Sequence, residues 1–280
     1  MMRRSSRMRL VRGTLFYLML AVILLVTILP FLWMLSSSFK GQEAIRTIPI
    51  RWIPERPTLE GYERVFNMQG FSFTRASLNS LLLAVGCTVA EVASSAMAAF
   101  VFAKLPFKGS GKVFGIYLAT MMIPNTVTMV PNYIILRSLG LLDTYTGLIL
   151  PYLGKAFSVF LMRQSMLGVN DAYLESAFLD GASLYRVFWK IMLPMVTPTL
   201  ATLTLISFMG SWNSYLWPLI VLTSTDKQTL QVVMVNMKGM YKNNEHVLMA
   251  GAVLTILPIL AVYLATQRYV DQGISLGGLK

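Results

Sequence analysis

Six stretches of this chain are long and apolar enough, or nearly so, to cross a lipid bilayer. A helix that crosses a hydrocarbon core of about 30 Å needs about 20 apolar residues. The windows that approach this length are residues 14–35, 78–103, 113–136, 145–162, 195–223 and 248–267. Four of them contain no charged residue. The sequence therefore predicts an all-α integral membrane protein with six transmembrane helices, built as a single domain over residues 1–280.

The composition agrees with a membrane protein and excludes several kinds of chemistry. Only 13% of the residues are charged, whereas soluble domains carry about a quarter. One cysteine, Cys87, and one histidine, His246, exclude an intrachain disulfide and the usual Cys/His metal sites. The chain also lacks a G-x-x-x-x-G-K-[ST] phosphate-binding loop. We therefore expect no catalytic residue, no bound metal and no ATP hydrolysis by this chain itself.

The distribution of basic residues predicts the orientation in the membrane. Five arginines lie in the first twelve residues, and the 104–112 loop carries three lysines and no acid. If both termini are cytoplasmic, the inner segments carry a net charge of +9 and the outer segments +3, as the positive-inside rule expects. The main outer loops are then 36–77, which contains a short amphipathic run from about Thr58, and 224–247. The polar loop 163–194 is cytoplasmic.

Prolines and polar residues interrupt several windows. Seven of the twelve prolines lie inside the windows, and each removes a backbone hydrogen bond that lipid cannot replace. Interrupted, polar-bearing helices are typical of a substrate pathway. The candidates for a translocation pathway or its gate are Asn125, Thr128, Asn132, Trp212, Asn213 and Tyr215. The alternative is that such polar groups only hydrogen-bond between helices, and for any single serine or threonine this alternative is favoured.

Two charged residues lie inside the windows, Glu91 in the second and Lys155 in the fourth. A charge at membrane depth suggests a function such as a proton relay. A Glu91–Lys155 ion pair, or a lysine that reaches the interface, is the structural alternative. With a single acid in the windows, the structural interpretation is favoured.

The segment ESAFLDGASLYRVFWKIMLP, residues 175–194, is polar although apolar windows precede and follow it. Asn170 or Asp171 can cap a short helix that ends at Leu179, and Asp180-Gly181 can then form a turn with a positive φ at the glycine. Ser183 can cap a second helix over 184–192. Residues 163–190 have zero net charge, which favours a protein contact over binding to anionic lipid.

This segment resembles the EAA motif of ABC importer permeases. The spacing E-x-A-x-x-x-G, followed after nine residues by I-x-L-P, is met by Glu175, Ala177, Gly181, Ile191, Leu193 and Pro194. Ser176 departs from the usual second alanine but is also small. The stretches GLLDTYTGLILPY, FLMRQSM, SWNSYLWPLIVL and QRYVDQGISLGGLK are similar to the maltose-importer-type permeases for sugars and glycerol 3-phosphate.

The resemblance implies a type I importer permease fold and a non-catalytic subunit that forms half of a pathway for a sugar-like solute. It implies a homologous second permease subunit, two cytoplasmic ATPase subunits that bind ATP and Mg²⁺, an extracytoplasmic substrate-binding protein, and a place in a prokaryotic inner or plasma membrane. The residues it implies for ATPase coupling are Glu175, Ser176, Ala177, Asp180, Gly181, Ala182, Ile191, Leu193 and Pro194. It also implies contact of the C-terminal tail with the ATPase dimer, at Gly277, Gly278 and Lys280.

Two other functional classes remain open from the sequence. An ion-coupled secondary transporter would use Glu91 and need no ATPase. A membrane-embedded enzyme is disfavoured because histidine, cysteine and paired intramembrane acids are scarce.

Overall fold

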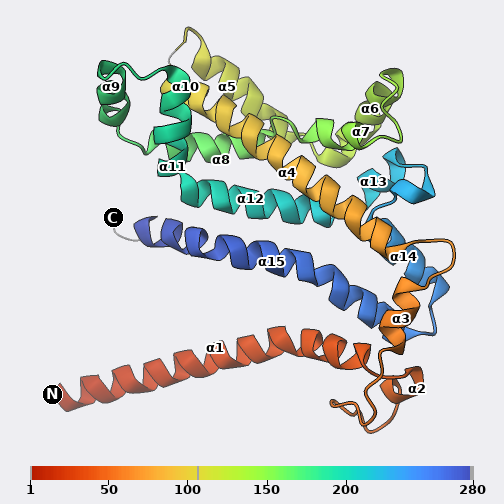
Figure 1. The fold of residues 1–280 in the computed structure, drawn as a ribbon. Coiled ribbons are helices and arrows are strands. Elements are labelled where there is room, and N and C mark those ends of the chain that lie inside the picture. The colour runs from red at the N-terminus through yellow and green to blue at the C-terminus, as the bar shows by residue number, and fades with distance from the viewer. Residues whose placement is uncertain (1, 106, 278–280) are drawn as a thin grey trace. The chain divides into compact units, whose positions relative to one another are not determined.

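The computed structural model describes residues 2–105 and 107–277, and every regular element in these ranges is helical (Figure 1). The α-helices are α1 (Met2–Ser38), α2 (Gln42–Ile45), α3 (Glu60–Phe66), α4 (Phe73–Lys104), α5 (Ser110–Ala119), α6 (Asn125–Ser138), α7 (Tyr145–Ile149), α8 (Ala156–Leu167), α9 (Ala172–Leu179), α10 (Leu184–Val187), α11 (Leu193–Met195), α12 (Thr197–Trp212), α13 (Leu216–Val221), α14 (Leu230–Met240) and α15 (Glu245–Gly277). Short 3-10 turns are η1 (Thr120–Met122), η2 (Leu150–Tyr152) and η4 (Thr225–Lys227), and η3 (Phe188–Met192) is a π-helical turn. The all-α class predicted from the sequence is confirmed.

Three continuous helical stretches are long and apolar enough to cross a membrane, namely Arg12–Ser38, Phe73–Lys104 and Glu245–Val270. Three further candidates are helix pairs with a sharp bend at a short break. The bends are 102° between Ser110–Met122 and Asn125–Ser138, 46° between Tyr145–Tyr152 and Ala156–Leu167, and 81° between Leu184–Met195 and Thr197–Trp212. The described chain therefore has up to six spans if each bent pair counts as one.

Prolines mark some of the breaks, but not all of the prolines break a helix. Pro124 directly precedes α6, and Pro151 lies in the η2 turn before the 46° bend. By contrast, Pro30, Pro131 and Pro258 lie inside the continuous helices α1, α6 and α15. Some prolines therefore lie at breaks between helices, as the sequence predicts, and others lie within continuous helices.

The window 195–223 does not fold as one straight helix. A turn at Val196, where ψ is 17°, separates α11 from α12. Helix α12 then ends at Trp212, and α13 begins only at Leu216. The bent candidate span instead begins upstream, at Leu184. A window of apolar residues records composition and cannot show where the backbone turns.

The chain divides into two compact units, residues 1–68 with 236–256, and residues 69–235 with 257–280. In the second unit, α4 is the central helix and packs against α8 and α12 (Figure 1). Ala96 and Ala99 on α4 are buried against Val159, Met162 and other residues in one apolar cluster. Small residues such as these allow helix backbones to approach closely in membranes. This packing fixes the scaffold on which the candidate sites lie.

In the first unit, the segment after α1 folds back onto the end of that helix. The buried Lys40 donates from Nζ to the Arg51 carbonyl at 2.5 Å and lies 4.1 Å from the centre of the Trp33 ring. Helix α3 approaches the start of α15 so closely that a Cβ on Gly61 would lie 2.8 Å from the His246 carbonyl oxygen. The amphipathic run expected from about Thr58 corresponds to α3.

Candidate coupling element and polar hollow

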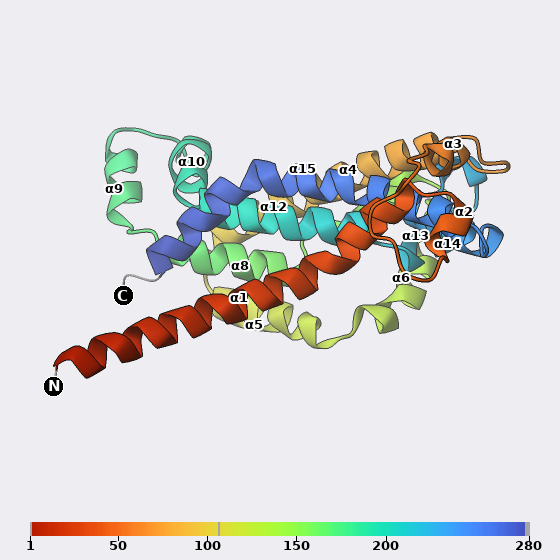
Figure 2. The ribbon, with the colours of Figure 1, turned by 90° about the horizontal axis from the view of Figure 1, so that it is seen from below.

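The residues predicted for ATPase coupling lie on a two-helix projection, which we call the helix pair (residues 172–195). Helices α9 and α10 lie together at one end of the second unit, beyond the ends of α8 and α12, in both views (Figure 2). The backbone between them closes through two hydrogen bonds, from Ala182 N to Ala177 O at 2.9 Å and from Gly181 N to Phe178 O at 3.0 Å. Gly181 has φ = 74°. This is a Schellman motif, in which glycine is the residue that adopts a left-handed conformation at little cost.

Side chains near the start of each helix of the pair accept backbone hydrogen bonds, although the N-cap residue of α9, Asp171, makes no side-chain cap. Asn170 Oδ1 accepts from Ala172 N at 3.0 Å, and Ser183 Oγ accepts from Arg186 N at 3.4 Å. Asp171, the other candidate cap of α9, instead pairs with Lys104 Nζ at 2.5 Å. Lys104 also donates to Val169 O at 2.7 Å. The segment that leads into the helix pair is therefore tied to the last residue of α4.

The second half of the helix pair is not the single regular α-helix that the sequence predicts over 184–192. Helix α10 covers only 184–187, and the π turn η3 follows. Val187, Phe188 and Met192 are buried in the core cluster, and the rings of Phe188 and Phe100 lie 5.3 Å apart. A π turn changes the spacing of side chains along a helix. Here three apolar side chains within six residues reach the same core.

The predicted coupling residues differ in exposure. Glu175, Ser176, Asp180, Gly181 and Pro194 are exposed, and Ala182, Ile191 and Leu193 are half-buried. Ala177 is buried and belongs to the core cluster. The exposed residues give the pair a free polar face, whereas Ala177 fixes α9 to the bundle. Of the predicted tail contact, Gly277 is the last residue of α15, and Gly278 and Lys280 lie outside the described residues.

The structure brings four of the predicted pathway residues together around a hollow of about 490 Å³. We call it the polar hollow, and its lining includes Asn125, Thr128, Asn132, Tyr152, Lys155 and Tyr215. Asn125, Thr128 and Asn132 come from α6, and Tyr215 comes from the break between α12 and α13. Amide, hydroxyl and aromatic groups therefore meet here from segments far apart in the sequence.

Two predicted pathway residues do not line the polar hollow. Trp212 is buried at the end of α12, with its ring stacked on Phe208 at 5.9 Å. Asn213 is the C-cap of α12 and is exposed. The neighbours Ser214, Leu216 and Trp217 line the hollow instead. The sequence indicates the right segment, but the chain turns at Asn213 and changes which side chains face the hollow.

Glu91 and Lys155 form an ion pair in the wall of the polar hollow. Lys155 Nζ donates to Glu91 Oε2 at 2.9 Å, and Ser158 Oγ donates to Glu91 Oε1 at 2.5 Å. The break before α8 places Lys155, because Gly154 has φ = 62° and Lys155 is the N-cap residue of α8. This contact agrees with the structural alternative weighed for these two charges.

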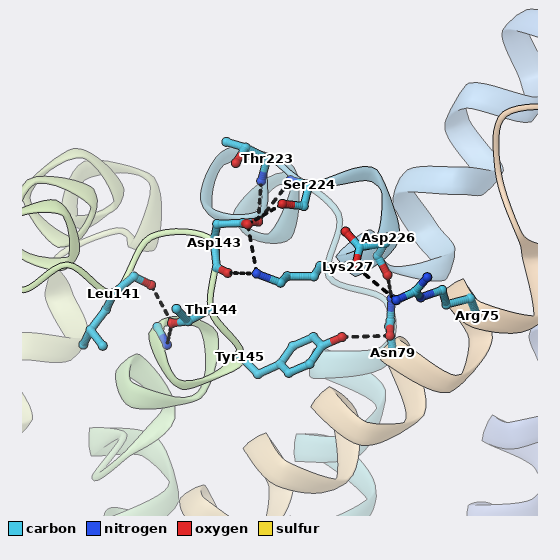
Figure 3. Close-up of polar contacts among 11 residues, drawn as sticks. Arg75, Asn79, Leu141, Asp143, Thr144, Tyr145, Thr223, Ser224, Asp226 and Lys227 are labelled. Atoms are coloured by element: carbon cyan, nitrogen blue, oxygen red, sulfur yellow. Dashed lines mark hydrogen bonds and ion pairs between the residues drawn. The ribbon is translucent and has the colours of Figure 1, made fainter.

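At the other end of α4, an aspartate fixes two helix ends to each other (Figure 3). Asp143 Oδ1 accepts from Thr223 N and Ser224 N, both at 3.0 Å, and Oδ2 accepts from the Ser224 hydroxyl. Lys227 Nζ donates to Asp143 O at 2.6 Å and to Oδ2 at 2.9 Å. We call this group of four residues the clamp. It joins the loop before α7 to the segment after α13.

The electrostatics of the clamp follow from these contacts. Hydrogen bonds from the Ser224 hydroxyl and backbone, together with Lys227 and Thr223 N, hold the pKa of the Asp143 carboxyl well below its usual range. Each contact stabilises the ionised form more than the protonated form. Asp143 has φ = 55°, a conformation that Asp tolerates better than most residues.

Helix α4 reaches the same region through Asn79. Its Nδ2 donates to Asp226 O at 2.9 Å and to Gln228 O at 3.0 Å, and its Oδ1 accepts from Tyr145 OH at 2.9 Å (Figure 3). The exposed Arg75 pairs with Asp226 at 3.1 Å. In the sequence, GLLDTYTGLILPY is only a point of resemblance, and it does not reveal the clamp. The only local signal is that Thr144 caps α7.

A chain with up to six spans, bent helices around a polar hollow and a polar two-helix projection has the architecture of a membrane transport subunit. Residues 92–276 match the family described as "Binding-protein-dependent transport system inner membrane component". The chain belongs to this family, and this confirms the resemblance to ABC importer permeases. The family is one of transport permeases, not of enzymes.

Curated relatives are similar over nearly the whole chain. The arabinooligosaccharides transport system permease protein AraQ of Halalkalibacterium halodurans is 34% identical over 262 residues, 93% of this chain and 94% of the relative. The sn-glycerol-3-phosphate transport system permease protein UgpE of Shigella flexneri serotype 5b is 31% identical over 242 residues, 83% and 85% of the two chains.

Solved structures support the fold. A chain of a bacterial ABC transporter involved in the import of the acidic polysaccharide alginate matches with a TM-score of 0.81 at 26% identity, over 92% of this chain and 96% of that chain. A second alginate transporter structure, in complex with an alginate pentasaccharide-bound periplasmic protein, matches with a TM-score of 0.63 at 18% identity, over 91% and 93%. The type I importer permease fold predicted from the sequence is confirmed.

Proposed function

We propose that the chain is one of two membrane-spanning subunits of an ATP-driven importer for a sugar or sugar-like solute. The relatives' names support a carbohydrate-class solute, since they mention arabinooligosaccharides and glycerol 3-phosphate. The polar hollow supports it as well, because its amide and hydroxyl groups can both donate and accept hydrogen bonds. Aromatic rings beside such groups suit the apolar faces of sugar rings.

The observation that carries the coupling proposal is the exposed helix pair. A permease without a nucleotide site must receive free energy from its ATPase through a mechanical contact. The helix pair exposes Glu175, Ser176 and Asp180, while buried Val187 and Met192 anchor it to the core. It continues through a sharp bend into α12. A push on α9 would therefore reach a helix that ends beside the polar hollow.

The remaining partners follow from this role. A homologous second permease would complete the pathway, two cytoplasmic ATPase subunits would bind ATP and Mg²⁺, and a substrate-binding protein would deliver the solute. The alginate transporter in complex with a periplasmic protein, named above, supports such a partner here. The match to an inner membrane component family supports a prokaryotic inner or plasma membrane location, and the basic N-terminal residues support cytoplasmic termini.

An ion-coupled transporter that uses Glu91 has less support. The residue is 3% exposed and both of its carboxylate oxygens accept hydrogen bonds, one from Lys155 and one from Ser158. A proton relay needs a carboxyl that can exchange its proton during the cycle. Glu91, buried and bonded to Lys155 and Ser158 within the helix bundle, instead has the contacts of a structural residue.

Replacement of Gly181 tests the coupling role. Gly181→Asp should abolish uptake and release the ATPase from the purified membrane subunits, because φ = 74° disfavours a side chain and the added group lies on the exposed face. Gly181→Ala places a side chain at the same strained φ but adds only a methyl group to the exposed face. Comparison of the two variants separates the effect of backbone strain from the effect of a side chain that blocks ATPase docking. Glu175→Ala should reduce coupling more mildly.

Gly140→Asp is the matched control. Gly140 also has a positive φ, 67°, and open space around its Cβ position, but it lies after α6, far along the chain from the helix pair. It should leave the ATPase attached. If Gly181→Asp retains both ATPase and uptake at the normal level, the helix pair is only a connector and the proposal fails.

A further inference from the structure

The wall of the polar hollow contains an ammonium group that the fold holds in place. Lys155 lines the hollow, and its side chain is 42% exposed although its Nζ is bonded to Glu91. The same Nζ lies 3.8 Å from the centre of the Tyr152 ring. A flexible lysine loses much of its rotamer freedom when two neighbours fix its head. Binding of a ligand would therefore cause little further loss of conformational entropy in this side chain.

The position of Glu91 makes this lysine a directed donor. The Glu91 side chain is 5% exposed, and its second oxygen is occupied by Ser158. An ammonium has three donors, and the described residues give Lys155 Nζ a single carboxylate. Lys155 lines the hollow, whereas the buried Glu91 does not. The pair is neutral as a whole but presents its positive end to the hollow.

The surrounding groups indicate what this donor would meet. Asn125, Asn132 and Ser214 also line the hollow, and none of these carries a charge. A volume of about 490 Å³ is in the range of small-molecule sites. A neutral pair among uncharged polar groups suits an uncharged, oxygen-rich molecule better than an anion, because an anion would have to compete with Glu91 for the same ammonium.

We propose that Lys155 hydrogen-bonds a hydroxyl or ring oxygen of the passing solute, and that Glu91 is the positioning residue that aims Lys155 and keeps the hollow selective for neutral sugars. This inference rests on the proposed function and adds a specificity-determining residue to it. It makes Glu91 responsible for the preference between neutral and acidic solutes.

The electrostatic half of the proposal can be measured without transport. Ser214 lines the same hollow as Lys155, so Ser214→Cys in a Cys87→Ala background places the single thiol of this chain on that lining. The assembled complex, with cysteine-free partner subunits, is treated with a cationic and an anionic methanethiosulfonate reagent of similar size. Glu91→Gln should raise the ratio of anionic to cationic labelling roughly five- to tenfold, as expected for one uncompensated charge on the lining of the same partly aqueous hollow. Glu91→Gln/Lys155→Met should return the ratio to the starting value. An unchanged labelling ratio in Glu91→Gln would overturn the proposal that Glu91 compensates the charge that Lys155 presents to the hollow.

Solute contact is tested by protection of the same thiol. Neutral arabinotriose should slow labelling of the thiol at position 214 when Glu91 and Lys155 are both present, and trigalacturonate should slow it less. Glu91→Gln should reverse this order, while Lys155→Arg should keep protection by arabinotriose. The double variant Glu91→Gln/Lys155→Met, which leaves no unpaired charge, should lose most protection. Equal protection with the native pair and with the double variant overturns the proposal.

These results separate the inference from the proposed function. If arabinotriose protects the thiol but the helix-pair variants leave the ATPase attached, the coupling role fails and the solute contact stands. If Gly181→Asp releases the ATPase while no solute protects the thiol, the importer role stands and the inference about Lys155 fails.

Discussion

The helix pair and the clamp lie near opposite ends of α4 and are stabilised in different ways. In the helix pair, the hydrogen bonds that shape the turn join residues no more than five positions apart, such as Ala182 N to Ala177 O. In the clamp, Asp143 bonds to residues 80 to 84 positions away. The first region can keep its local shape while it moves as a body. The second can keep its shape only if two distant segments stay together.

Under the proposed coupling role, this difference predicts which end of the second unit is fixed and which end moves. The clamp holds α7 and α13, and the residues that follow or begin these helices, Tyr152 and Trp217, line the polar hollow. The helix pair is tied to the core by buried apolar side chains from α9 and from the segment 187–192, and by the contacts of Lys104. We expect a stiff hollow at the clamp and a lever at the helix pair. The following predictions test this contrast, from the largest expected effect to the smallest.

Loss of the clamp carboxylate should have the largest effect on stability. Asp143→Ala removes the acceptor for two backbone amides, a hydroxyl and a lysine, and places alanine at a positive φ. We expect a loss of about 2–3 kcal/mol, since several hydrogen bonds of about 1 kcal/mol each are removed. Thermal unfolding of the purified complex measures it. Asp143→Asn, which keeps the shape and tolerates the backbone conformation, should lose less. An Asp143→Ala variant as stable as the parent would show that the clamp is not a fixed point.

The clamp should also weaken at low pH. The pKa of Asp143 is lowered in the folded state, so the carboxylate stabilises the fold above its unfolded pKa of about 3.9 and loses this contribution as the pH falls toward the folded value. The difference in Tm between the parent and Asp143→Asn should therefore be constant from pH 7 to about 5 and shrink below about 4. A difference that grows on acidification would contradict the assigned contacts.

A change within the helix pair should act locally. Ser183→Ala removes the cap of α10 and should cost about 1 kcal/mol. Because the turn is closed by short-range contacts, the loss should appear as faster amide hydrogen exchange in residues 184–187, with little change in global unfolding. Ser183→Asp, which can also cap the helix, is the control. Equal acceleration of exchange at the clamp would mean that the two regions are not independent.

The smallest effect is expected from the exposed ion pair beside the clamp. Arg75 and Asp226 have side chains 61% and 50% exposed, so Arg75→Ala should cost at most about 0.5 kcal/mol and less at high salt. Asn79→Ala, which removes three hydrogen bonds in the same region, should destabilise the complex more than Arg75→Ala. If Arg75→Ala destabilises the complex more than Asn79→Ala, the ranking of contacts at this end is wrong.

The helix pair can be predicted from the sequence because its determinants are local. The positive φ of Gly181 and the cap by Ser183 both follow from residues within a few positions, and both are present. The π turn cannot be predicted in this way, because it depends on which side chains the core accepts. The sequence offers Asn170 and Asp171 as alternative caps of α9, but Asp171 takes the N-cap position without a side-chain cap because its carboxylate pairs with Lys104, 67 positions away.

The clamp and the lining of the hollow depend on long-range contacts, which the sequence largely hides. Asp143 in the sequence is one acid in a short loop, and nothing nearby indicates Ser224 or Lys227 as its partners. The polar residues of α6 are predicted to serve the pathway, and they meet Tyr215 at the hollow. Asn213 is predicted with them but does not line the hollow, because one turn of backbone decides the direction of each side chain there. Apolar length and charge bias, by contrast, are sufficient for the fold class.

The π turn at Phe188–Met192 has a consequence for insertions and deletions. A π turn closes with an i→i+5 hydrogen bond and so contains one residue more than an α-helical turn. Removal of one residue inside this turn would give an ordinary α-helix and leave the helices on either side in nearly the same rotational phase. Removal of one residue from α9 would instead rotate everything beyond it by about 100°, given 3.6 residues per turn. The segment between Val187 and Leu193 is thus a place in the helix pair where one residue can be removed without rotating the exposed face of α9 relative to the bundle.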